Sequence, residues 1–286
     1  MSFENFKATL MLARMVLLAR KNLVGSEFCD LGLGIGLTQK GKQVTINTEG
    51  EVVSFDTDEA NPMSYSDNDT TANTLTITLD KTIAVKLLDR DMHEIESGRQ
   101  TLESALAGRM MYTLNDDVDQ LVMDQYLNAG SDSFETGSTP WQWGTDASDW
   151  PKFCAALHKA MDDLDLPGQG RFMAVPNVAA QGVRLYYGSR ATTLGDKMHE
   201  NGKIADDLFG FSVYQSRNVK GSSTLHGLAG IKRDGLALAV QISPKIEKLR
   251  LEGFWADGIR SRITAGAKVY KPNNLIDINL NATLLA

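Results

Sequence analysis

The spacing of hydrophobic positions changes several times along the chain, and each change marks an expected element. Residues 42–47 and 75–85 alternate apolar with polar side chains, which is typical of β-strands with one buried face. A long polar stretch separates them, so we expect an extended hairpin with a solvated tip. Residues 8–19 carry apolar side chains at helical spacing, which predicts an amphipathic N-terminal helix.

The longest helical pattern runs from Ser97 to Ala129. At 1.5 Å per residue it predicts a rod of about 50 Å. The stripe is not a sustained heptad array, which favours a helix that lies across a sheet over a coiled coil. Gly130 stands where a C-cap is expected. Apolar side chains recur at every fourth position of the stripe, at Leu102, Leu106, Met110, Leu114, Val118 and Val122.

The second half of the chain alternates between helical and strand patterns and then continues as strands. Residues 151–164 and 176–187 predict helices, and the apolar runs at 171–175 and 211–215 predict short strands, the latter after a turn at Gly210. The order of hairpin, long helix, α/β insert and antiparallel strands predicts an α+β fold with a central insert. The later strands are expected at 228–231, 236–242, 246–251 and 259–269.

Composition narrows the classes of protein. The 286 residues are 42% hydrophobic, which is ordinary for a folded chain. With 29 basic and 36 acidic residues the net charge is −7, which argues against a protein that grips nucleic acid phosphates. Cys29 and Cys154 make neither a disulfide framework nor a zinc motif, and they fit a reducing compartment. The apolar stretch at 8–19 is too short to cross a bilayer and lacks a convincing signal-peptide cleavage site.

No motif for catalysis or cofactor binding stands out. The segment at 36–43 has the G-x4-G-K spacing of a phosphate-binding loop, but Gln43 replaces the Ser or Thr that would hold Mg²⁺, and a strand follows. Gly32, Gly34 and Gly36 lack the spacing of a dinucleotide motif and are interpreted as a hinge; the three glycines alternate with apolar residues.

One pair of side chains has the spacing of metal ligands. His158 and Asp162 stand four residues apart on an expected helix and could share a metal, although a solvated pair is the simpler interpretation. The chain has neither a nucleophile elbow nor a paired-histidine zinc motif. We therefore predict no catalytic residue, no cofactor and no metal site.

The order of elements resembles the major capsid proteins of tailed bacteriophages with the Hong Kong 97-type fold, which encapsulin shells share. Val85–Arg99 resembles that family's entry to its spine helix, and Gly170–Pro176 resembles its R-x-x-V-x-P strand and following helix. Ile204–Val219 resembles the strand that comes next, and the terminal strands ending at Lys271–Pro272 also agree. The resemblance covers most of residues 20–275.

The resemblance implies a non-enzymatic coat protein. Hexamers and pentamers of the chain would self-assemble into an icosahedral shell around a double-stranded DNA genome, without specific DNA binding and without a membrane. The location would be the virion capsid, assembled in the cytoplasm of the bacterial host. A separate scaffolding protein and a portal are the implied partners.

The same resemblance implies five regions. They are an N-terminal arm (1–40), an extended hairpin or E-loop (41–85), a peripheral or P-domain with the spine helix (86–130), an inserted axial or A-domain (131–240), and the return strands of the P-domain (241–286). Three alternatives stay open: an encapsulin-type compartment, another virion protein that forms rings or tubes, and an enzyme built on residues 150–220.

Charge is distributed unevenly. Residues 49–69 contain seven acidic and no basic side chains, whereas residues 245–271 contain seven basic and three acidic ones. The acidic segment is either a solvated loop or a docking surface. Our sharper hypothesis is that the acidic hairpin of one subunit lies on the basic strands of a neighbour. The candidate contact residues are Glu49, Glu51, Asp56, Asp58, Glu59, Lys245, Lys248, Arg250, Arg260 and Arg262.

Overall fold

The computed structural model describes most, but not all, of the chain. The expected N-terminal helix at 8–19, the glycines Gly34 and Gly36, and the acidic hairpin tip at 49–69 lie outside the described residues. The described residues are 23–33, 43–48, 70–89, 99–130, 134, 140–141, 149–188 and 203–281.

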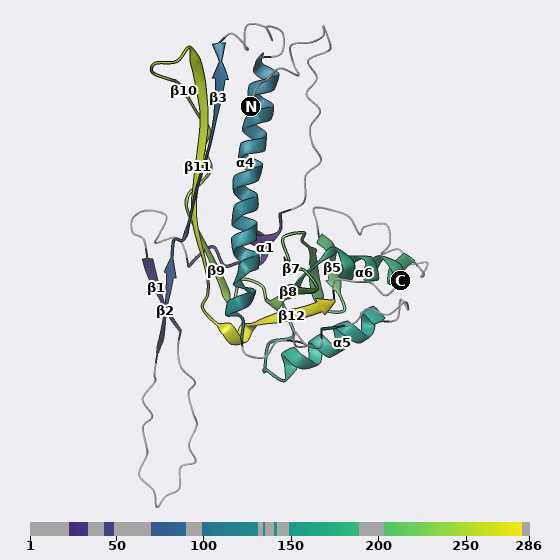
Figure 1. Ribbon diagram of the computed structural model, residues 1–286. Helices are drawn as coiled ribbons and strands as arrows, with labels where there is room; N and C mark the ends of the chain where they lie inside the picture. Colours follow the sequence, from purple (N-terminus) through teal and green to yellow (C-terminus); the bar gives the residue numbers. More distant parts are fainter. Residues whose placement is uncertain are drawn as a thin grey trace, which may run out of the picture.

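A four-stranded antiparallel sheet, here called the spine sheet, forms one side of the molecule (Figure 1). Its central strand is β11 (Ala256–Val269), which pairs with β3 (Leu79–Leu88) along one edge. Along the other edge it pairs with β9 (Leu236–Ile242) and then with β10 (Glu247–Arg250). The predicted C-terminal strands are therefore confirmed, with small differences in their ends.

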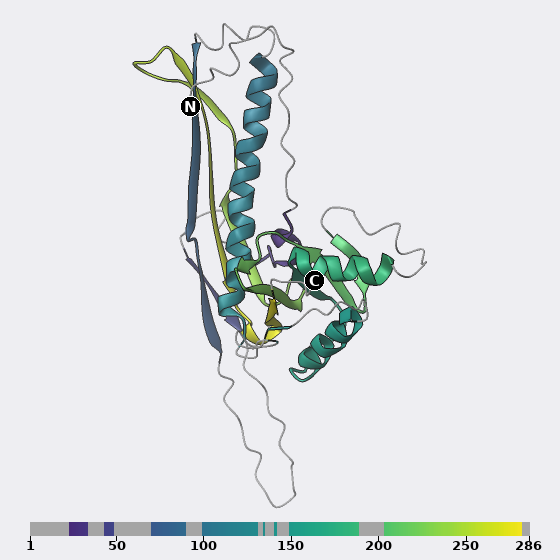
Figure 2. The ribbon, with the colours of Figure 1, turned by 45° about the vertical axis from the view of Figure 1, so that its right-hand side comes forward.

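The long helix α4 (Arg99–Met123) lies along the spine sheet in both views (Figures 1 and 2). From Met110 to Val122 its apolar stripe is buried, with Leu114 and Val122 fully so and Met110 packed on Leu87 and Ile259 of the sheet. This arrangement confirms the predicted helix across a sheet. The last predicted turn tightens into a 3₁₀ helix, η2 (Asp124–Asn128).

Gly130 has a different role from the one predicted. It does not adopt a positive φ, so it is not a left-handed C-cap. Its N–H donates to the carbonyls of Pro272 and Leu275, at 3.0 and 3.1 Å. A Cβ at this position would lie 2.9 Å from the carbonyl oxygen of Pro272. Glycine is required here because two segments of backbone approach closely.

The short hairpin before the spine sheet is confirmed, and its second strand is shorter than predicted. β1 (Gln43–Thr48) pairs with β2 (Thr71–Thr76). The predicted strand at 75–85 is divided between two partners. Its first part belongs to β2, which pairs with β1, and its second part belongs to β3, which pairs with β11. Gly266 of β11 makes this transfer possible, since a Cβ there would lie 2.4 Å from the carbonyl oxygen of Thr76.

A second unit, here called the α/β unit, is built on a mixed sheet with the strand order β12-β8-β4-β6-β5, and β7 pairs with β8. The predicted helices and strands of the insert are confirmed, including the turn at Phe209 and Gly210, where φ is 50° and 80°. The elements are α5 (Asp149–Asp162), β4 (Arg171–Val175), α6 (Asn177–Gly188), β5 (Lys203–Leu208), β6 (Phe211–Gln215), β7 (Lys220–Gly221), β8 (Thr224–Ile231) and β12 (Leu275–Asn281).

Strand β4 shows how the two units share one core. Its five side chains are all buried, as expected for a strand that is covered on both faces. Met173 and Val175 pack among the apolar side chains of α5 and α6. Phe172 faces the other way and stacks on Phe28 of α1 (Gly25–Phe28), with ring centroids 4.4 Å apart.

The chain passes between the units twice near its end. β9 lies almost entirely in the range expected for the A-domain, yet it pairs with β11 in the spine sheet. β12 lies in the range expected for P-domain return strands, yet it pairs with β8 in the α/β unit. The 3₁₀ turn η4 (Pro272–Asn274) connects β11 of the spine sheet to β12 of the α/β unit. Continuous strand patterns in the sequence do not show this change of partner.

Candidate assembly surfaces

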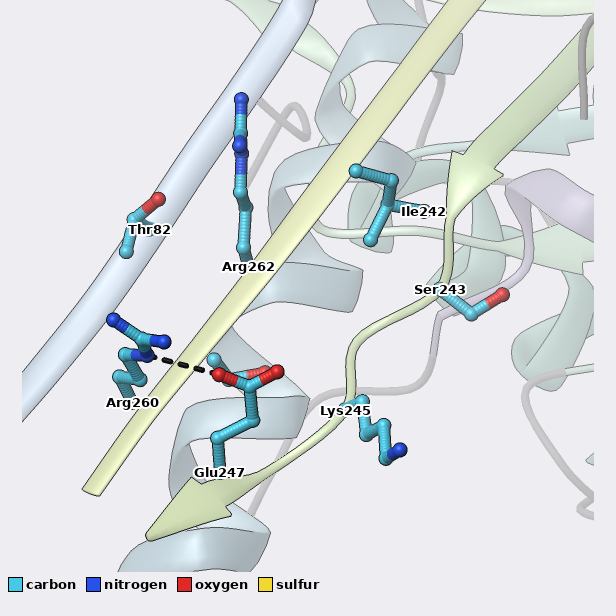
Figure 3. A pocket seen from close by; sticks show the side chains of 8 residues that line it. Thr82, Ile242, Ser243, Lys245, Glu247, Arg260 and Arg262 are labelled. Carbon is cyan, nitrogen blue, oxygen red and sulfur yellow. Dashed lines mark hydrogen bonds and ion pairs between the residues drawn. The ribbon is translucent and has the colours of Figure 1, made fainter. Parts of the chain in front are cut away.

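The outer face of the spine sheet, which is the face turned away from α4, carries paired charges. Arg262 donates two hydrogen bonds to the carboxylate of Asp80, at 2.8 and 2.5 Å. Arg260 donates to Glu247 at 2.9 Å, and Figure 3 shows this pair beside β11. All four side chains are more than half exposed. The outer face is therefore a solvated surface of alternating charges.

Two basic residues of β10, Lys248 and Arg250, lie on the opposite face. Directly opposed residues share a face of an antiparallel pair, and neighbours alternate. Arg250 is opposite Asp257, and Lys248 is opposite the buried Ile259 on the α4 side. Arg250 donates to Asp89 and Asp257, and Lys248 lies 3.7 Å from Asp257.

The predicted basic contact residues thus do not form one surface. The alternation of the strands divides Arg260 and Arg262 from Lys248 and Arg250. Lys245 lies between β9 and β10 and has no ion pair with any residue in the described ranges. The five acidic partners, Glu49, Glu51, Asp56, Asp58 and Glu59, lie outside those ranges. Their docking on a neighbour stays a prediction.

The ion pairs also fix the charge states of their members. The hydrogen bonds from Arg262 lower the pKa of the Asp80 carboxyl below its usual value. Hydrogen bonds to Asp89 and Asp257 raise the pKa of the Arg250 guanidinium. Arg250, Arg260 and Arg262 are each paired with a nearby carboxylate, which leaves less positive charge for an acidic hairpin than the sequence count of basic residues suggests.

A hollow opens on the edge of the spine sheet between β9 and β10. Ile242 is opposite Thr264 and Glu247 is opposite Arg260, so residues 243–246 bow away from β11. Pro244 within this segment has no N–H for the ladder. The hollow has a volume of about 460 Å³ and is lined by Thr82, Ile242, Ser243, Lys245, Glu247, Arg260, Ser261 and Arg262 (Figure 3).

The hairpin tip, residues 251–255 between β10 and β11, exposes large apolar side chains. Trp255 is 82% exposed and Phe254 is 60% exposed. The ammonium of Lys86 lies 3.5 Å from the centre of the Phe254 ring. The tip lies at the end of the spine sheet that is remote from α5 and α6 (Figure 1). Sequence reasoning missed it, because Phe254 and Trp255 fall between the strands expected at 246–251 and 259–269, and the pattern does not show whether they face a core or solvent.

His158 and Asp162, the pair with the spacing of metal ligands, are instead bridged by Arg171. The buried guanidinium of Arg171 donates to Asp162 Oδ1 at 2.5 Å and meets His158 Nδ1 at 2.7 Å. It also donates to the carbonyls of Leu166 and Pro167. Because a fixed cation occupies the space between the two side chains, they do not form a metal site. Among the described residues no group of three potential ligands is placed to bind a metal.

A buried carboxylate joins three parts of the chain. Asp119 of α4 accepts hydrogen bonds from the N–H groups of Val24 and Gly25, at 2.9 and 2.6 Å. It also accepts one from the side-chain amide of Asn218 at 2.5 Å, and Ser216 lies at 3.5 Å. Asp119 of α4 thereby caps the N-terminus of α1. The N-cap residue of α1 itself, Val24, has no side chain that could do so. The apolar stripe in the sequence gave no sign of this role.

In the stretches of chain that the structure describes, every helix is too short or too polar to span a bilayer.

Comparison with known proteins gives matches only among solved structures. No protein-family model and no curated protein sequence matches the chain. A chain from Mycobacterium phage Che8 is 21% identical, with 97% of this chain and 98% of that chain covered and a TM-score of 0.72. The capsid structure of cyanophage P-SCSP1u gives 14% identity, 96% and 94% coverage, and a TM-score of 0.65.

A third structure, the capsid of Ralstonia phage GP4, matches at 12% identity over 100% of this chain and 98% of that chain, with a TM-score of 0.63. Identities this low establish the fold and not the function. The resemblance to phage capsid proteins drawn from the sequence is confirmed at that level. The chain is a mixed α+β protein with the fold of phage capsid chains.

Proposed function

We propose that this chain is a major capsid protein of a tailed bacteriophage, with the Hong Kong 97-type fold, which self-assembles into an icosahedral shell around double-stranded DNA. The observation that carries the proposal is the end-to-end fold match to chains of capsid structures, which covers 96% of this chain for cyanophage P-SCSP1u and 100% for Ralstonia phage GP4. Such a match involves the whole architecture rather than one common supersecondary motif.

The elements support an assignment of the family's regions to this chain. α4 and the spine sheet would form the P-domain with its spine helix. The α/β unit would form the A-domain, and the β1–β2 hairpin would form the base of the E-loop. In this assignment β9 belongs to the P-domain and β12 to the A-domain, because strand pairing and not chain order decides the membership.

A structural role agrees with the surfaces of the molecule. The spine sheet presents a long charged face, and an exposed aromatic tip ends it. The two cysteines are poor nucleophiles, because burial raises the pKa of the Cys154 thiol to about 12 and also raises that of Cys29. We propose that the protein acts by assembly rather than by catalysis.

The proposed partners follow from the same role. Copies of the chain would associate as hexamers and pentamers, aided by a separate scaffolding protein and closed by a portal in the host cytoplasm. The net charge of −7 supports enclosure of DNA without tight binding, since strong phosphate contacts would hinder packaging and release.

Negative-stain electron microscopy of the purified full chain, with sedimentation velocity as a second readout, tests this proposal. We expect closed shells, partial shells or capsid-like rings. A protein that remains a monomer at every concentration, with and without its scaffolding partner, would contradict the proposal. Extraction of particles from infected cells then separates the alternatives: DNA inside indicates a viral coat, and enzyme cargo indicates an encapsulin-type compartment.

A further inference from the structure

The hairpin tip has the composition of a contact site. Trp255 is more exposed than any other large hydrophobic residue in the described ranges, at 82%. Leu251 covers the outer face of Gly258 beside it, and Leu88 is 43% exposed on the neighbouring strand. Tryptophan is among the residues that most often dominate binding energy, since it buries a large rigid surface. Its exposure at a sheet tip therefore indicates a surface that is covered in the assembled state.

The tip is also held in place. The N–H of Leu251 donates to the carbonyl of Ala256 at 3.1 Å, and the carbonyl of Trp255 accepts from the N–H of Asp89 at 3.0 Å. Next to the tip, Arg250 donates hydrogen bonds to both Asp89 and Asp257. A preorganised tip loses little conformational entropy when it binds, which favours a specific contact.

The hollow on the same sheet offers a complementary surface. Ile242, 40% exposed, supplies an apolar wall, as Figure 3 shows. Arg260 and Arg262 use the edges of their guanidinium groups to bind Glu247 and Asp80. Their flat faces remain available for stacking on an aromatic ring. With about 460 Å³, the hollow falls in the range of roughly 300–1,000 Å³ that is typical of ligand pockets.

We propose that Trp255 of one copy of this chain docks in the hollow of a second copy, with its indole ring between Ile242 and the guanidinium faces of Arg260 and Arg262. This inference deepens the proposed function and rests on it, because the occupant is another subunit. Trp255 lies five and seven residues before Arg260 and Arg262 along the same hairpin, which is roughly 15–25 Å. One copy can therefore use tip and hollow at once, so the contact is head-to-tail and can close into a ring.

Two single variants test the two halves of the contact. Trp255→Ser removes the tip side chain, and Ser243→Trp fills the hollow from within. Both positions lie at the surface, so we expect the far-UV circular dichroism and melting temperature of the subunit to stay unchanged. We expect either variant to lower the yield of particles at least tenfold, while Trp255→Phe retains most of it. Normal particles from Trp255→Ser would overturn the proposal and leave the capsid function standing.

A mixture of the two variants tests the direction of the contact. Ser243→Trp retains an intact tip and Trp255→Ser retains an intact hollow, so the mixture should form a one-to-one complex that neither variant forms alone. Sedimentation velocity at high concentration measures this without requiring shells, so it decides the contact even if the proposed function fails. Two folded variants that do not associate would overturn the proposal.

Leu127→Ser serves as the matched control, because Leu127 is 75% exposed in η2, away from the hairpin. It should associate like the unmodified chain. A loss equal to that of Trp255→Ser would contradict the assignment of the contact to the tip.

Discussion

The spine sheet and the α/β unit both rely on arginine–carboxylate pairs, but they use them in opposite settings. Arg171 in the α/β unit is 2% exposed and is held by two side chains and two carbonyls. Arg262 in the spine sheet is 53% exposed and has one carboxylate partner. The first arginine fastens the fold, because its loss would leave buried acceptors unpaired. The second can exchange partners at little cost, which suits a surface that meets other subunits.

The largest expected effect on stability comes from replacing the buried arginine. Arg171→Met should lower the free energy of unfolding of the isolated subunit by roughly 2–4 kcal/mol, because the carbonyls of Leu166 and Pro167 and the ring of His158 lose their donor. Chemical denaturation followed by tryptophan fluorescence measures it. Arg262→Met makes the same chemical change on the surface and should leave the stability unchanged. Equal losses from both variants would refute the distinction.

Asp119→Ala probes the junction between the two regions. It removes the acceptor of the Val24 and Gly25 amides, which should cost roughly 1–3 kcal/mol and speed hydrogen exchange of those two amides. Asp116→Ala is the control, since Asp116 also accepts a hydrogen bond from Asn218, whereas the Val24 and Gly25 amides donate to Asp119. If the amides of Val24 and Gly25 exchange at the same rate in both variants, the cap on α1 is not supplied by Asp119.

Alkaline pH should weaken two buried cores: the one that the two units share, which contains Cys29, and the one of the α/β unit, which contains Cys154. The folded pKa of Cys154 is raised to about 12 and that of Cys29 is also raised, both mainly by burial. The unfolded chain therefore loses these protons first, and stability falls as pH rises above about 9, by up to about 1.4 kcal/mol per pH unit for each thiol.

A double Cys29→Ala, Cys154→Ala variant isolates the thiol contribution. Denaturant midpoints measured from pH 8 to pH 10.5 should decline less steeply for this variant than for the unmodified chain. Parallel declines would assign the alkaline loss to other groups, such as Tyr214, whose pKa burial also raises to about 12.

The smallest expected effect concerns a carboxylate at the edge of the α/β unit. Asp277 pairs with His226, whose ring stacks on Tyr126 of η2. Burial raises the pKa of Asp277 despite the opposing hydrogen bond from His226. Because the folded pKa is raised, the ionised form costs stability at neutral pH, and this cost disappears as pH falls below the ordinary value of 3.8.

Asp277→Asn should therefore give a small gain in stability at pH 7 that vanishes near pH 3. Thermal melts of both proteins across this range measure the difference. A variant that is less stable at pH 7 would show that the ion pair with His226 outweighs burial.

Local elements were predictable where one pattern decides the structure. The four-residue spacing from Met110 to Val122 specified the buried face of α4, and the apolar run at 171–175 specified β4. Partners of strands were not predictable, because the pattern of a strand such as β9 or β12 does not say which sheet it joins, and these two belong to different sheets. The alternation along β10 and β11 was visible, but the division of the basic residues between two faces depends on register, which only the folded structure fixes.

The candidate surfaces were partly accessible in the same way. Arg260 and Arg262 were predicted as contact residues and lie on the exposed outer face. The exposure of Trp255 was not, because sequence alone does not show whether an aromatic residue at the end of a strand faces a core or solvent. Similarly, His158 and Asp162 had the spacing of possible metal ligands. The sequence did not show that Arg171, which lies on the next strand, contacts both side chains.

The most direct test of the whole account is a cryo-electron microscopy reconstruction of the particles formed by the full chain. The account predicts a closed icosahedral shell in which each subunit contains α4 beside the spine sheet and the α/β unit next to them. A chain that forms no shell under any assembly condition, or particles whose subunits lack this arrangement, would contradict it.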